Sequence, residues 1–174
     1  VEVLDRLAAG SDSVVAIVRD PYDTALSTLR FWRLWPARLQ AVERILYRMV
    51  GLLGHVPPQF SDGRELVHYV ARNWVDFVDW CQSHSLYVVR YEDLVRDPRP
   101  RLRELCEHCG ILFDERMLDH LHPRRSFAGI GDPGMMNRPP KPVSVHSTGR
   151  RYQLAPEYRQ IVAEKCASAA AALG

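Results

Sequence analysis

An arginine followed at once by a helix start could bind an anion near the beginning of the chain. Arg19 follows an apolar run in SVVAIVRDPYDTALS, residues 13–27, and Asp20 and Pro21 come directly after it. Aspartate is a favourable N-cap, proline fits the first helical position, and Asp23 adds a first-turn carboxylate. A guanidinium beside the N–H groups of a helix N-terminus can hold a phosphate or sulfate. The residues alone predict either such an anion site or ion pairs of Arg19 with Asp20, Asp23 or a neighbouring helix.

A second segment with anion-binding chemistry lies far along the chain. The stretch from Phe127 to Tyr152 is rich in glycine and proline and ends in STGRRY, in which Gly149 is followed by Arg150 and Arg151. A glycine between hydroxyls and two guanidiniums is suited to wrapping an oxyanion. A solvated basic loop is the alternative interpretation of the same residues.

Two short strands must position these groups. The runs Val14–Val18 and Leu86–Tyr91 are apolar without alternation, which is typical of parallel strands covered on both faces, and each leads into a helix. Ligands of open α/β sheets bind at the carboxyl ends of the strands, where Arg19 lies. The pattern predicts an α/β fold with a parallel sheet flanked by helices, within a single domain over residues 1–174. Further helices are expected at residues 2–9, 21–35, 39–53, from Ser61 or Asp62 to about Cys81, 98–110, 114–121 and from Pro156 onward.

Composition and charge exclude some classes of protein for this chain. The net charge of +2 is too small to indicate nucleic-acid binding, although 21 of the 23 basic residues are arginine. No apolar run approaches the ~20 residues that cross a bilayer, and no signal peptide is evident, so we expect a cytoplasmic protein without a membrane span. The pair Cys106 and Cys109 has C-x-x-C spacing, but both cysteines fall on one apolar helical stripe, so we expect core packing and no metal.

Together these segments resemble the PAPS-dependent sulfotransferases. In that family a strand ends in R-[DN]-P and a serine follows eight residues after the arginine, a pattern that Arg19 and Ser27 match. A later strand ends in R-Y-E-D-L, matched at Tyr91, and a C-terminal loop carries glycine and basic residues, matched at Gly149, Arg150 and Arg151. The resemblance implies that Arg19, Ser27 and the loop hold the 3′-phosphate of the nucleotide, and that Tyr91 lies near the adenine.

The resemblance implies a P-loop-NTPase-like fold that is incomplete at its N-terminus. The family binds the donor's phosphosulfate with a P-loop-like turn carrying a lysine, and its general base also lies early; here no lysine precedes Lys141. We therefore expect the donor turn and the base upstream of Val1, and the resemblance assigns no catalytic residue to this chain. The implied reaction transfers a sulfuryl group from PAPS to an acceptor hydroxyl or amine, leaving PAP, without a metal.

The residues are compatible with more than one acceptor and more than one function. A small molecule, a glycan or a lipid could be sulfated, and Trp32, Trp35, Phe60 and Trp74 could line its pocket or simply pack in the core. A non-catalytic nucleotide-binding paralogue would bind PAP without turnover, and a P-loop kinase would bind ATP without preferring a 3′-phosphate. An arginine-rich nucleic-acid binder would gather its arginines on one face and show steep salt dependence.

Overall fold

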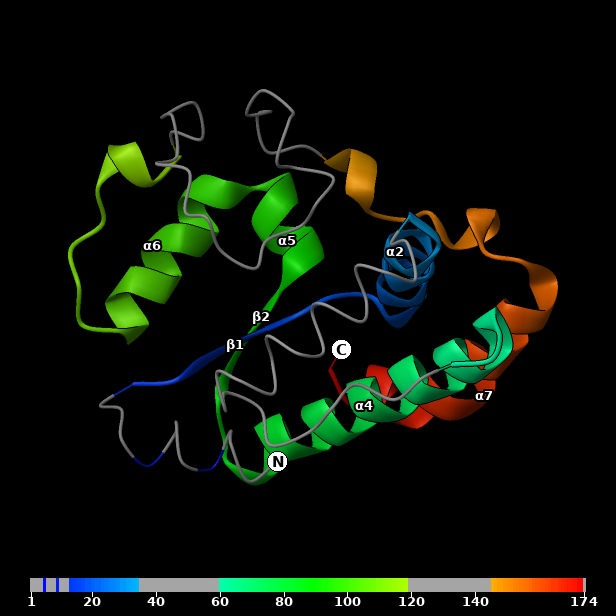
Figure 1. Ribbon diagram of the computed structural model, residues 1–174. Helices are drawn as coiled ribbons and strands as arrows, with labels where there is room; N and C mark the ends of the chain where they lie inside the picture. The colour runs from blue at the N-terminus through cyan, green and yellow to red at the C-terminus, as the bar shows by residue number, and fades with distance from the viewer. Residues whose placement is uncertain (1–4, 6–8, 10–12, 35–59, 119–144, 174) are drawn as a thin grey trace, which may run out of the picture.

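A computed structural model describes Asp5, Ala9 and residues 13–34, 60–118 and 145–173. Its helices and strands follow in the order β1 (Val15–Val18), α2 (Pro21–Leu34), α4 (Gly63–Ser83), β2 (Tyr87–Arg90), α5 (Tyr91–Arg96), α6 (Pro98–His108) and α7 (Pro156–Ala172). Between α6 and α7 the described residues form the short 3-10 turns η1 (Glu115–Leu118), η2 (Val145–Ser147) and η3 (Arg151–Gln153). The chain is helix-rich, with a small sheet at its centre (Figure 1).

The two strands pair in parallel, as their sequence predicts. Val15 lies opposite Tyr87 and Val18 lies opposite Arg90, so both strands end at the same level. The described part of the chain forms a two-stranded sheet. One prediction was wrong at the end of β2: Tyr91 does not extend the strand but begins the short helix α5, which the sequence pattern did not predict.

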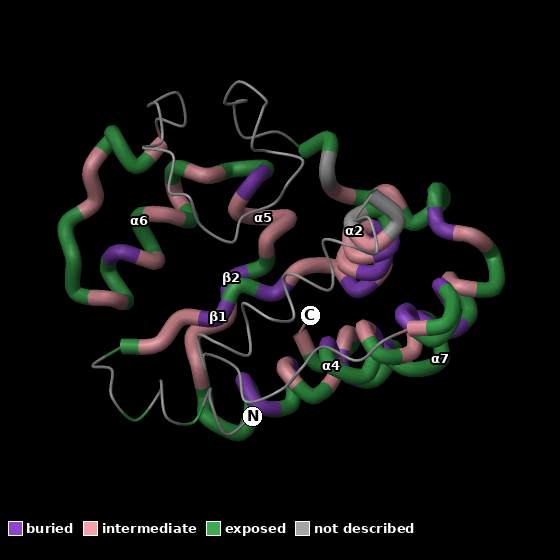
Figure 2. Tube along the Cα trace, in the orientation of Figure 1, coloured by how far each residue is buried: buried purple, intermediate pink, exposed green. Residues whose placement is uncertain are grey.

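The hydrophobic core lies where α2, α4 and α7 pack together beside the strands (Figures 1 and 2). Val67 and Val78 of α4 and Val162 of α7 are almost completely buried. Gly63 permits this close packing, because a Cβ atom there would lie 2.7 Å from the hydroxyl of Tyr158 on α7. The remaining buried apolar residues of this cluster are Val18, Ala25, Leu26, Leu29, Leu66, Ala71, Trp74, Leu154, Ile161, Cys166 and Ala169.

Helix starts follow the predicted capping chemistry. The Asp62 carboxylate accepts a hydrogen bond from the Glu65 backbone N–H at 2.8 Å, which confirms Asp62 as the N-cap of α4. Pro98 and Pro156 each stand at the start of a helix, α6 and α7 respectively, as expected.

The C-x-x-C pair lies at the C-terminal end of α6. Cys106 is buried and Cys109 is partly buried, and both are free thiols. Within the described residues, no group of three or more histidine, cysteine and acidic side chains could hold a metal ion. A helix long and apolar enough to cross a bilayer is likewise absent from the described helices.

Several predicted features fall on residues that the structure does not describe. They are the helix at 39–53, the side chain of Trp35 and most of the segment from Phe127 to Tyr152. Of the helix expected at residues 2–9, Asp5 and Ala9 are described and are helical. The helix expected at 114–121 is the 3-10 turn η1 over its described part.

Candidate functional site

The ends of the two parallel strands bring Arg19 and Tyr91 together. Each residue directly follows its strand, and the register of β1 against β2 places them at the same level. The guanidinium carbon of Arg19 lies 4.9 Å from the centroid of the Tyr91 ring. A cation over an aromatic face is attracted by the ring's quadrupole, so this contact helps to fix the direction of the arginine.

The backbone around Arg19 is held from two further elements. The indole N–H of Trp74, on α4, donates a hydrogen bond of 2.8 Å to the carbonyl oxygen of Arg19. The Asp20 N–H donates to the carboxylate of Glu92, on α5, at 3.0 Å. Trp74 therefore packs in the core and also hydrogen-bonds the residue that follows β1.

The N-terminus of α2 satisfies its own N–H groups. One oxygen of Asp20 accepts hydrogen bonds from the N–H groups of Tyr22 at 2.8 Å and Asp23 at 3.0 Å, which confirms Asp20 as the N-cap. The Thr24 N–H donates to the Asp20 carbonyl at 2.9 Å, and Pro21 has no N–H. The prediction that first-turn N–H groups are exposed to an anion was wrong. An anion here would be held by side chains.

Asp23 joins this helix to the distant glycine turn. Its side chain is fully buried, and its two oxygens accept hydrogen bonds from the N–H groups of Gly149 at 2.7 Å and Arg150 at 2.9 Å. The Nε atom of Arg150 lies 4.0 Å from the same carboxylate. The backbone N–H groups of this turn thus bind a carboxylate of the protein itself.

Sequence reasoning missed this role of Asp23, although one signal could have indicated it. Asp23 precedes the buried Leu26 by three positions on α2, so its side chain lies on the inward face of that helix. A carboxylate on an inward face needs a partner, because an unpaired buried charge is strongly destabilising.

The other predicted residues lie around this junction with less direct contact. Ser27 is partly buried on α2, one turn after Asp23. Arg151 is exposed and begins η3. The Arg30 side chain donates a hydrogen bond to the Gln153 side chain, which attaches η3 to α2, and η2 contacts α5. Residues 145–153 thus bridge α2 and α5.

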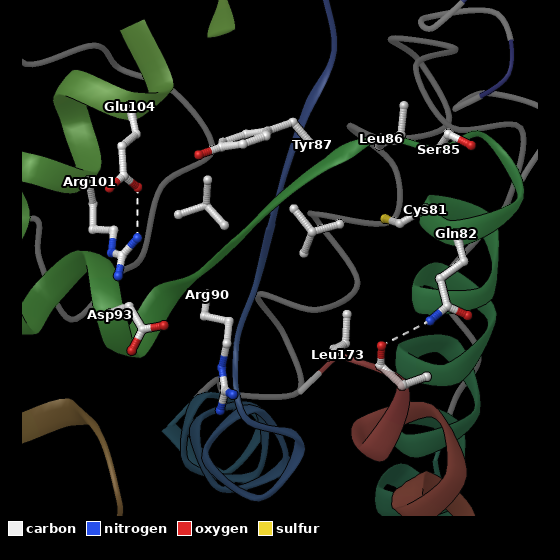
Figure 3. Close-up of a pocket in the computed structure, with 13 residues that line it drawn as sticks. Cys81, Gln82, Ser85, Leu86, Tyr87, Arg90, Asp93, Arg101, Glu104 and Leu173 are labelled. Carbon is white, nitrogen blue, oxygen red and sulfur yellow. Dashed lines mark hydrogen bonds and ion pairs between the residues drawn. The ribbon is translucent and has the colours of Figure 1, made fainter. Parts of the chain in front are cut away.

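A cavity of about 360 Å³ lies along β2, and the predicted site residues do not line it (Figure 3). It is bounded by β2, the C-terminal ends of α4 and α7, and charged residues of α5 and α6 that include the ion pair of Arg101 with Glu104 at 2.7 Å. Burial raises the pKa of the Cys81 thiol on its wall, so this sulfur is a poor nucleophile at neutral pH. A smaller cavity of about 60 Å³ opens at the strand ends, between Arg19, Trp74 and Glu92.

The arrangement of these residues defines a class of protein. It is an α/β protein with a parallel sheet, in which cationic side chains and an aromatic ring gather where the strands end and α2 begins. That edge is the usual ligand-binding edge of open α/β sheets.

Comparison with known proteins assigns the family. Residues 12–115, more than half of the chain, match the model of the sulfotransferase family, and the chain therefore belongs to that family. Comparison with curated proteins found no match.

A solved structure, the sulfotransferase domain from the curacin biosynthetic pathway, is similar with a TM-score of 0.52 at 22% sequence identity. The match covers 92% of this chain and 56% of that one, so the chain spans little more than half of the domain's length. At this identity the likeness concerns the fold, which is P-loop-like with a small parallel sheet.

Proposed function

We propose that the chain, as one domain, binds the 3′-phosphoadenosine nucleotide of PAPS and serves a sulfuryl transfer to an acceptor hydroxyl or amine. Arg19, Ser27, Arg150 and Arg151 hold the 3′-phosphate, with Gly149 shaping the turn, and Tyr91 lies near the adenine. The observation that carries the proposal is the junction at the start of α2. There the residue after β1 contacts the residue after β2, and the glycine turn is bonded to the first helical turn.

The chemistry of these groups fits the proposed ligand. Guanidiniums bind phosphate oxygens with charge-assisted, often bidentate hydrogen bonds, and three of them occur among the residues named. An aromatic ring offers a stacking face for a purine. The N–H groups of Gly149 and Arg150 are not available to the phosphate, because Asp23 accepts both hydrogen bonds. The proposed phosphate site is therefore built from side chains.

PAPS supplies the sulfuryl group: a bond forms from the acceptor oxygen or nitrogen to sulfur, and the bond from sulfur to the bridging phosphate oxygen breaks. The acceptor loses its proton to a base, for which no residue of this chain is proposed. The residues named above act at a distance from sulfur, by holding the far end of the nucleotide so that the donor is correctly placed. The acceptor class proposed is a small molecule, a glycan or a lipid, and we propose a cytoplasmic location.

Calorimetry with PAP and AMP tests the proposal, because the two nucleotides differ in the 3′-phosphate. We expect the full chain to prefer PAP, and Arg19→Ala to weaken PAP binding by about 10–150-fold, the equivalent of one lost hydrogen bond to a charged group (~1.5–3 kcal/mol). Ser27→Ala, which removes a neutral hydroxyl, should weaken it by about tenfold or less.

The matched control is Arg64→Ala, which removes an exposed arginine ten residues before Trp74 on α4. It should leave PAP affinity unchanged. Equal affinity of Arg19→Ala and wild type for PAP would refute the site, and a preference for ATP over PAP would favour a P-loop kinase.

A further inference from the structure

We propose that Asp23 is a positioning residue of the nucleotide site: its carboxylate fastens the Gly149–Arg150 turn to the first turn of α2 and so sets where the Arg150 guanidinium lies. This inference rests on the proposed function, and it adds a residue that does not itself touch the nucleotide.

The hydrogen bonds of Asp23 are of the kind that hold a loop firmly. Both side-chain oxygens are used, one for the Gly149 N–H at 2.7 Å and the other for the Arg150 N–H at 2.9 Å. The carboxylate is fully buried, and hydrogen bonds to ionised groups in such surroundings are stronger than neutral ones. The nearby Nε of Arg150, at 4.0 Å, adds an opposite charge.

The backbone of the turn is shaped to receive a carboxylate. Gly149 has φ +67°, in the left-handed region, and Arg150 follows with φ −94° and ψ 18°. Successive residues of opposite hand point their N–H groups toward one point and form an anion-binding nest. The Asp23 carboxylate occupies this nest, so the N–H groups of the turn bind Asp23. The arginine side chains of the turn are then the groups that bind the ligand.

The hydrogen bonds between Asp23 and the turn bring together two arginines that are far apart in sequence. Arg19 stands directly before the N-cap of α2, and Asp23 lies in the first turn of that helix. By bonding to Asp23, the turn brings Arg150 to the same end of α2 as Arg19. Two guanidiniums held at one helix end can contact one phosphate, whereas a loose loop would have to be ordered by the ligand at an entropic cost.

The first test is Asp23→Asn, which keeps the shape of the side chain but places an NH2 group against a backbone N–H. We expect PAP affinity to fall about tenfold or more while AMP affinity stays unchanged, because AMP lacks the phosphate that Arg150 contacts. Hydrogen exchange of the Gly149 and Arg150 amides in the nucleotide-free protein should become at least tenfold faster. Asp62→Asn is the matched control, since Asp62 also bonds a backbone N–H at a helix start, and it should change none of these quantities.

A second variant changes the turn itself and leaves Asp23 in place, in case Asp23→Asn does not fold. Gly149→Val strains the left-handed backbone, and the Cβ atom that it adds at Gly149 would meet nothing within 4 Å. Gly110 offers a matched control, with φ +66° and equally open surroundings after the end of α6. Gly149→Val should lower PAP affinity and spare AMP affinity, whereas Gly110→Val should lower stability alone.

The outcomes separate this inference from the function on which it rests. If wild type prefers PAP and the folded Asp23→Asn or Gly149→Val variant keeps that preference in full, Asp23 does not position the site. Unchanged exchange of the two amides in folded Asp23→Asn would also overturn the inference, whatever the nucleotide data. If wild type itself shows no preference for PAP over AMP, the proposed function fails instead, and the exchange rates still decide whether Asp23 fastens the turn.

Discussion

The hydrogen bond from Trp74 to Arg19 predicts a difference in stability between substitutions of two buried tryptophans on one helix. Trp74 and Trp80 lie on the same helix and are 8% and 6% exposed. The Trp74 indole N–H donates to the Arg19 carbonyl at 2.8 Å, and that of Trp80 donates to the Asp5 carboxylate at 2.6 Å. Substitution by phenylalanine removes the same donor and the same ring volume at each position.

The two substitutions should differ in cost, because the two hydrogen-bond acceptors that lose the indole N–H differ in their access to water. The hydrogen bond from Trp74 to the Arg19 carbonyl is partly buried. In Trp74→Phe this carbonyl loses its donor, which should lower the free energy of unfolding by about 1–3 kcal/mol. In Trp80→Phe the Asp5 side chain is 47% exposed and can bond to water instead. Both substitutions also remove part of a buried ring, which adds a packing loss at each position. We therefore expect Trp74→Phe to be the more destabilising by about 1–2 kcal/mol.

Urea titration followed by far-UV circular dichroism measures this difference without relying on tryptophan fluorescence. Under the proposed function, Trp74→Phe should also weaken PAP binding, because it releases the backbone that directs Arg19, and Trp80→Phe should not. Equal losses of unfolding free energy in the two variants would refute the assignment of the Arg19 carbonyl as a group that needs Trp74.

Two titrations give further predictions. Burial raises the pKa of the Cys166 thiol from 9.0 to about 11, so the folded state holds this proton more tightly than the unfolded state. The contribution of this difference to the free energy of unfolding is fully present below pH 9, and about 2 kcal/mol of it is lost as the pH rises from 9 to 11. The midpoint of urea unfolding should therefore fall between pH 8 and pH 11. Cys166→Ala should make this fall smaller. The Arg116 guanidinium and backbone N–H hold the pKa of Asp114 at about 2. NMR of the side-chain carboxyl group should show this pKa rising toward 3.8 in Arg116→Ala and unchanged in the control Arg96→Ala. A pKa that rises in Arg96→Ala but not in Arg116→Ala would contradict the pairing of Asp114 with Arg116.

Local structure was predictable because its causes lie within a few residues. The apolar runs gave both strands and their parallel pairing, and the Asp20 and Asp62 caps followed from side-chain chemistry at adjacent positions. The error at Tyr91 has a local cause as well: an aromatic residue after an apolar run extends a strand pattern, while the acidic pair Glu92 and Asp93 favours the first turn of a helix.

The sequence by itself determined which groups are available: guanidiniums at Arg19, Arg150 and Arg151, a glycine at position 149, and a family pattern that links them. Only the tertiary structure decided how they are used. The capping of α2 by its own Asp20, and the bonding of Asp23 to a turn 126 residues later, depend on which groups meet in space. No spacing rule reports such a meeting, because a buried carboxylate takes whichever donors the packing of distant elements brings to it.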